Sequence, residues 1–206
     1  MASAMYPLTD PNKQNIPTYR HQIREKIILF ADNFTIKDEM GQDVYAVRSK
    51  IVSFQKNFHI EDMLGNGMIK IEQGFPHLHP TYNILSARHG DFGRQLGVLK
   101  QQFELLFHKK FNIDSVYGQY CLESLDISAH SFILTKNGRI VATINKTYFS
   151  TSDTYGVEIA ADEDQAFILA IVIVLDQILY NNYNGSNRSF QLGSTNRNSN
   201  PFKLNF

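Results

Sequence analysis

The sequence has little cysteine, no tryptophan and no excess of either charge sign. Cys121 is the single cysteine among 206 residues, which excludes an internal disulfide and a cysteine-rich metal site. Lysine and arginine together number 20, as do aspartate and glutamate, so no overall field draws the chain to nucleic acid or to an anionic membrane. The first residues lack a basic segment followed by an apolar one. We therefore expect a cytoplasmic protein with at most peripheral membrane contact and no nucleic-acid partner.

The short motifs of common enzymes are absent as well. The sequence contains no Walker loop, no GxSxG, no HExxH and no dinucleotide fingerprint. His77 and His79 alternate between Pro76 and Pro80, and alternate histidines can share a metal, but no third ligand is evident and the prolines favour a surface loop. We expect a non-enzymatic protein with no cofactor and no bound metal.

One apolar run stands out. From Ala166 to Leu175 ten consecutive residues are apolar, and Asp176 then ends the run. A helix that is apolar on every side lies either in a membrane or in a protein core, and crossing a bilayer takes roughly 20 such residues. Several β-branched residues would suit a strand, but the segment is too long for a usual strand. We predict a buried central helix near residues 162–180, with Asp162 as N-cap and Gln165 as its partner three residues on.

A strand-and-turn pattern recurs before this run. The segments Phe34–Gly41, Phe58–Gly65 and Phe132–Gly138 each place apolar residues two apart and end in a glycine-containing turn. Asn137-Gly138 is typical of a tight type I′ hairpin turn. The pattern predicts a succession of antiparallel hairpins. Further predicted strands are Glu25–Ala31, Tyr45–Lys50, Met68–Gln73, Thr81–Ser86, Leu96–Lys100, Phe103–His108, Tyr120–Ile127, Arg139–Lys146 and Thr154–Ile159.

These elements together predict the fold class. Closing the sheet removes free strand edges, and the apolar helix can fill the interior of the closed sheet. A barrel that holds a helix needs more strands than the roughly eight whose side chains alone fill the interior. We predict a mainly β fold, a closed antiparallel β-barrel of about twelve strands enclosing one hydrophobic α-helix. The barrel domain spans 20–183, with a mobile proline-containing arm at 1–19 and a disordered Asn/Ser-rich tail at 184–206.

Two stretches also resemble a known family. They are DVYAVRSKIVSFQKNFHIEDMLG, at 43–65, and DTYGVEIAADEDQAFILAIVIVLDQI, at 153–178. Both are similar to the LURP-one-related family, which belongs with the tubby C-terminal domains and the phospholipid scramblases. The resemblance covers roughly Ile23 to Tyr180. It implies a twelve-stranded antiparallel barrel around a central helix, whereas relatives on this fold differ in what they do.

Arg48 and Lys50 form the candidate binding site. They stand two apart on a predicted strand, so both side chains point the same way and could hold one phosphate group. The resemblance implies a phosphoinositide site here, because tubby domains use a Lys-x-Arg pair on the corresponding strand, although the order of the two residues is swapped in this chain. The alternative interpretation is a solvated outer strand face.

Two function hypotheses follow. The first is a binding module that takes an acidic phospholipid headgroup or a protein partner on the outer barrel surface. The second is a scramblase-like membrane protein that moves phospholipids between leaflets. The second is disfavoured because the chain has no cluster of cysteines for palmitoylation and the apolar run is short.

Other polar groups have simpler interpretations. The acidic residues Asp153, Glu158 and 162–164 could bind calcium, but helix capping accounts for most of them and the EF-hand spacing is absent. Lys109-Lys110 is expected in a solvated turn after a strand. Cys121 is expected to be a small core residue, since no basic partner adjoins it.

Overall fold

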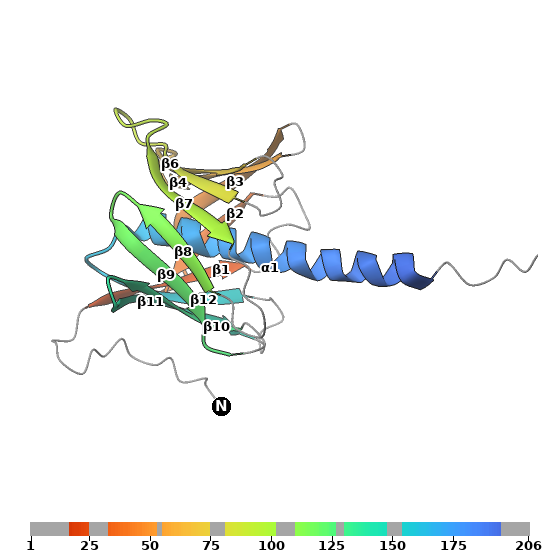
Figure 1. Cartoon of the computed structure of the whole chain (residues 1–206). Helices are drawn as coiled ribbons and strands as arrows, with labels where there is room; N and C mark the ends of the chain where they lie inside the picture. Colours follow the sequence, from red (N-terminus) through yellow and green to blue (C-terminus); the bar gives the residue numbers. More distant parts are fainter. Residues whose placement is uncertain are drawn as a thin grey trace, which may run out of the picture.

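The computed structural model describes residues 17–24, 33–52, 55–74, 81–101, 110–126, 130–147 and 154–194. Within these residues twelve antiparallel strands close into a barrel, and helix α1 runs through it (Figure 1). The elements are β1 Thr18–Arg24, β2 Phe34–Asp38, β3 Asp43–Val52, β4 Gln55–Asp62, β5 Gly67–Gln73, β6 Thr81–Ser86, β7 Gln95–Gln101, β8 Lys110–Ser115, β9 Gly118–Ser124, β10 Ser131–Lys136, β11 Arg139–Thr147, β12 Thr154–Ala160 and α1 Gln165–Ser194. The predicted fold class is confirmed.

Neighbouring strands in the chain pair with each other, and β1 closes the barrel against β12. Burial alternates along the strands: on β6, Tyr82 and Ile84 are buried, and on β9, Tyr120 and Leu122 are buried. Because successive side chains point to opposite faces of a strand, these residues face inward and their neighbours face outward. The alternation is what allows one face of the sheet to enclose α1.

The helix fills the barrel. Every residue from Ala166 to Leu175 is at most 1% exposed. The contact with the sheet is close at Gly97 of β7, where a Cβ atom would lie 3.1 Å from Phe167 Cζ. A helix with no exposed side is stable only when other elements cover it on all sides, which the closed sheet does here.

The two ends of the barrel are distinct. Helix α1 begins at one end and leaves at the other, where it continues beyond the strands to Ser194 (left to right in Figure 1). The rim denotes the connections at the end where α1 begins, together with the first two residues of each strand that starts there. Its connections are 39–42, 63–66, 87–94, 116–117, 137–138 and 161–164.

Some predicted boundaries differ from the structure. Strand β1 begins at Thr18, inside the predicted arm, and Lys110 begins β8 instead of lying in a turn. Both strands have weak patterns, because β1 turns the polar His21 inward and β8 has only two buried apolar residues. The predicted strands 25–31 and 103–108 lie outside the described residues.

Helix α1 starts later and ends later than predicted. It begins at Gln165 and runs to Ser194, well past the expected end near residue 180. The residues after 180 did not predict this extension, because asparagine, serine and glycine have low helix propensity and favour caps and turns. The division into arm, barrel domain and tail stays a prediction, since 1–16 and 195–206 lie outside the described residues.

Candidate functional site

The start of α1 is held by Asp164. Its Oδ1 accepts a hydrogen bond from the Phe167 backbone N–H (3.1 Å), so Asp164 is the N-cap, and the predicted cap at Asp162 is wrong. Asp164 Oδ2 also accepts from Arg88 Nη2 (2.7 Å) and from the Tyr117 hydroxyl (3.0 Å). Burial and the Asp164 charge raise the pKa of Tyr117, so its hydroxyl stays a donor. The cap therefore ties the helix to β8–β9 and to the β6–β7 connection.

Glu163 is the most enclosed carboxylate at this end, with a side chain 2% exposed. The Tyr120 hydroxyl donates to Glu163 Oε2 (2.7 Å), Lys136 Nζ lies 3.1 Å from the same atom, and Arg139 Nη2 donates to Oε1 (2.9 Å). Burial, then the hydrogen bond to Glu163, raises the pKa of Tyr120. A buried carboxylate with two cations and a hydroxyl is compensated, so this cluster locks the helix in place.

The acidic stretch therefore has structural partners. Asp162 pairs with Arg139 (2.9 Å), and Glu158, on the outer face of β12, pairs with Arg20 (3.7 Å). Asp153, like His77 and His79, lies outside the described residues. Within the residues that the structure describes, no group of three or more His, Cys, Asp or Glu side chains is placed to hold a metal ion.

Arg48 lies on the outer face of β3, and its side chain is about half exposed. Arg48 Nε is 2.7 Å from Glu61 Oε2 of β4. Lys50 follows two positions along β3, where it pairs with Asn57 of β4. Both residues lie on the predicted strand. Their role in binding a phosphate group stays a prediction.

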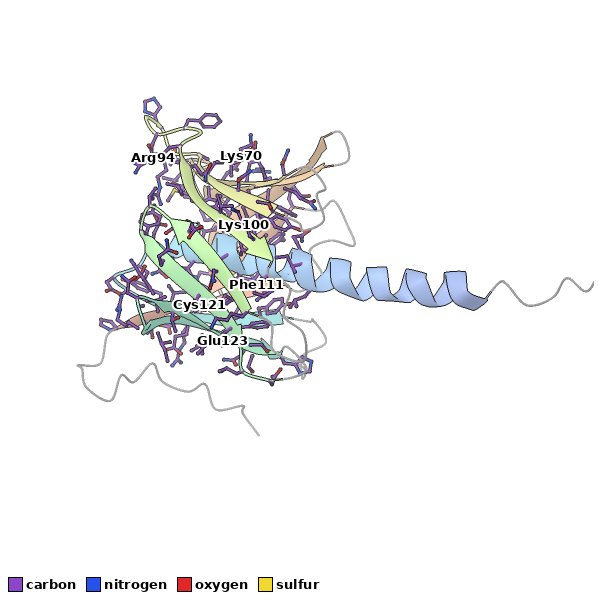
Figure 2. The ribbon with its side chains drawn as sticks, viewed as in Figure 1. Lys70, Arg94, Lys100, Phe111, Cys121 and Glu123 are labelled. Carbon is purple, nitrogen blue, oxygen red and sulfur yellow. The ribbon has the colours of Figure 1, made fainter. Side chains whose placement is uncertain are left out.

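The strand register adds two residues that the sequence alone did not indicate. Arg48 pairs with His59 of β4, and His59 pairs with Lys70 of β5, so three basic residues form one row across three strands. Lys70 Nζ lies 2.5 Å from Glu72 Oε1, and Figure 2 labels Lys70 in the upper part of the barrel. Such a row is invisible to sequence reasoning until the pairing of β3, β4 and β5 is known. We call Arg48, His59 and Lys70 the basic row.

Cys121 is not in the core. It is half-buried and lies on β9, where Figure 2 labels it. Its side chain takes an outward position and lines an open depression of about 470 Å³ over β8–β10. Its neighbours Tyr120 and Leu122 take the inward positions, so the period-two pattern forces Cys121 outward. Amide side chains such as Asn112 and Gln119 line the same depression. The depression has little charge among its lining side chains, which makes it unlike a phosphate-binding site.

Among the residues that the structure describes, no helix is long and apolar enough to cross a membrane.

Comparisons with known proteins agree with the fold. The chain is similar to an uncharacterized protein, YxjI, of Bacillus subtilis (strain 168), with 28% identity over 160 residues that cover 77% of this chain and 93% of that protein. An X-ray structure of an Arabidopsis thaliana protein superposes with a TM-score of 0.58 at 16% identity, covering 83% of this chain and 97% of that one. The LURP-one-related family model matches residues 20–176, so the resemblance noted in the sequence is confirmed and the chain belongs to the LURP-one-related family.

Proposed function

We propose that this protein is a non-enzymatic binding module that takes an anionic phospholipid headgroup on the outer face of β3–β5. The family and the barrel fold support a binding role in general terms. The observation that carries the specific proposal is the basic row, which crosses three neighbouring strands in register.

Because α1 occupies the interior of the barrel, we expect a ligand to bind on the outer surface. Among the described residues, Ala166–Leu175 and the inward side chains of the strands pack into one core, so we look for a headgroup-sized ligand on the outer surface. The acidic groups at the rim are already engaged with Arg88, Lys136 and Arg139. Arg48 is different, because its side chain is about half exposed and its ion-pair partner Glu61 lies on the outer strand face.

A phosphate group can compete for Arg48. Exposed ion pairs contribute only about 0–1 kcal/mol, so exchanging Glu61 for a doubly charged phosphate costs little. Arginine also holds phosphate oxygens through two parallel N–H donors, which strengthens the contact. Positive charge from Lys70, whose partner is Glu72, would add to the attraction, in a manner that salt screens. Lys50 keeps its predicted role from the sequence, two positions after Arg48 on β3.

Vesicle sedimentation tests this proposal. We expect wild type to bind phosphatidylcholine vesicles containing phosphatidylinositol bisphosphate, and binding to weaken as salt increases. The double variant Arg48→Ala/Lys50→Ala should bind several-fold more weakly. The control Lys100→Ala/Lys110→Ala removes the same charge from β7 and β8 and should keep wild-type binding.

Thermal melts of all three proteins show whether each remains folded. Equal binding by wild type and Arg48→Ala/Lys50→Ala would contradict the site. No binding by wild type to any anionic vesicle would contradict the lipid proposal and leave a protein partner as the ligand to seek. The scramblase-like alternative stays a prediction that no specific contact favours.

A further inference from the structure

The rim carries a set of exposed apolar side chains. They are 39–88% exposed, although each is large enough to be expected in a core. The seven residues are Tyr19, Met40, Met63, Leu64, Phe92, Val116 and Ile140. We call them the rim apolar set.

These side chains are distributed around one end of the barrel. Met40, Leu64, Phe92 and Val116 come from four different connections, and Tyr19 and Ile140 are the second residues of β1 and β11. The strand pairing puts all of these segments at the end where α1 begins, because β2–β3, β4–β5, β6–β7, β8–β9 and β10–β11 all turn there. Figure 1 shows the β6–β7 and β8–β9 connections at that end.

The turns hold these side chains outward by specific hydrogen bonds. In the β4–β5 turn, Asp62 Oδ1 accepts from the backbone N–H of Leu64 (2.9 Å) and of Asn66 (2.8 Å). Asp38 does the same in the β2–β3 turn, accepting from Met40 N–H (2.9 Å). Hydrogen bonding of Asp62 to Asn66 also lowers the pKa of Asp62, so it remains an acceptor. Leu64, 88% exposed, and Met40 are therefore presented by formed turns.

The rim carries more acidic than basic charge. Its acidic residues are Glu39, Asp43, Asp91 and 162–164, and its basic residues are Arg88, Arg94 and Arg139, whereas the connections 63–66, 116–117 and 137–138 contain no charged residue. The acidic residues of 161–164 are paired with Arg88, Lys136 and Arg139. A rim with this charge gains nothing from an anionic surface, so its apolar side chains have to carry any contact with lipid.

The β6–β7 connection combines an apolar tip with flanking charges of both signs. Phe92 is exposed between Asp91 and Arg94, whose charged groups lie 3.6 Å apart, and Figure 2 labels Arg94 beside this connection. Gly90 and Gly93 have positive φ (83° and 81°), which sets the shape of the loop. An aromatic side chain that reaches the acyl boundary, with charges of both signs at the level of zwitterionic headgroups, suits the interface of a phospholipid bilayer.

We infer that the rim is a membrane-docking surface, which inserts its rim apolar set into the interface of a phospholipid bilayer. A bilayer fits this arrangement better than a folded partner. Single side chains raised on separate turns can each enter a fluid surface, whereas a protein interface usually needs a contiguous, densely packed core. The inference is independent of the basic row, which lies on the outer strand face.

Because the rim would dock through apolar side chains, its binding should respond to salt and to lipid charge differently from the basic row. Apolar burial is almost insensitive to salt, while attraction between exposed charges is screened. Binding through the rim therefore occurs on neutral phosphatidylcholine vesicles and persists at high salt. Binding through the basic row requires anionic lipid and weakens with salt.

The experiment uses neutral phosphatidylcholine vesicles and the full chain. We expect wild type to sediment with them, and Leu64→Ser/Phe92→Ser to bind about tenfold or more weakly, because two large apolar side chains are lost from the interface. The matched control is Leu125→Ser, which removes an exposed leucine at the opposite end of the barrel. All these sites are exposed, so the variants should melt like wild type.

A fluorescent probe locates the contact. In a Cys121→Ser background, an environment-sensitive label on Leu64→Cys should shift to the blue with vesicles, and one on Leu125→Cys should not. Absence of binding to neutral vesicles, or equal binding by the rim variant, overturns the inference. Self-association of wild type that the rim variant loses, without vesicle binding, would also overturn it in favour of an interface between copies. Binding that requires anionic lipid and is lost only in Arg48→Ala/Lys50→Ala would leave the proposed function intact and refute the rim.

Discussion

His21 is a polar side chain that the barrel buries beside the start of α1. It lies on the inner face of β1, 7% exposed, with Nε2 3.2 Å from Gln165 Oε1 and its ring 6.3 Å from that of Tyr45. Burial lowers the pKa of His21 below 6.5, and the Gln165 hydrogen bond and the Asp38 charge offset only part of this effect. Its Nδ1 has no hydrogen-bond partner within the described part of the chain, so the neutral ring is the form that fits.

This environment predicts a pH dependence of stability. With a lowered folded-state pKa, the unfolded chain takes up the proton first as pH falls through about 6.5, so the folded state loses stability below that pH. His21→Gln should abolish this component. Urea unfolding of both proteins between pH 8 and pH 5 measures it, and a constant difference in unfolding free energy across that range would contradict the account.

The individual residues also show where sequence reasoning stops. The inward positions of the strands and the placement of Arg48 could be predicted, because period-two patterns report a face. The exposure of Cys121 could have been predicted too, from Tyr120 and Leu122 on either side. The neighbours His59 and Lys70 could not, because pairing between strands depends on register that no local pattern specifies.

At the scale of the element, α1 is specified by its apolar length and by the groups that hold its first turn. The apolar run could be read directly from the sequence, and its burial followed from elementary physics. The cap could not be assigned, because three consecutive acidic residues offer equivalent local patterns. Only the tertiary partners Arg88, Lys136 and Arg139 decide that Asp164 caps the helix and Glu163 is enclosed.

Glu163 should therefore be important for stability. Glu163→Gln keeps the side-chain size but leaves Lys136 and Arg139 without their shared negative partner, and breaking a buried ion pair typically costs about 3–5 kcal/mol. We expect a loss of this order in the free energy of unfolding measured with urea, changed little by salt. Glu39→Gln, at an exposed turn position, is the control and should change it by less than about 0.5 kcal/mol. A Glu163→Gln protein as stable as wild type would show that the ion pairs of Glu163 do not stabilise the fold.

At the scale of the whole molecule, the barrel and its helix depend on each other. The closed sheet gives α1 the apolar surroundings that water cannot, and α1 supplies the interior packing that strands alone would leave empty. The fold class could be predicted because both halves of this dependence appear in the sequence, as hairpin signals and as one apolar run. The two proposed binding surfaces could not be predicted, because the rim and the basic row arise only when distant segments are brought together.

Removing the helix tests this dependence directly. Each fully buried large apolar side chain contributes roughly 1.5–3 kcal/mol to stability. A whole domain is stable by only about 5–15 kcal/mol. Losing the apolar side chains of Ala166–Leu175 therefore removes more free energy than the total stability of the domain. The measurement is thermal unfolding of the fragment Met1–Ala161 beside the full chain, followed by circular dichroism. We predict that the full chain melts cooperatively and that the fragment is insoluble or shows no cooperative transition. A soluble Met1–Ala161 fragment with a sharp melt would contradict the claim that α1 fills the barrel and leaves only its outside for binding.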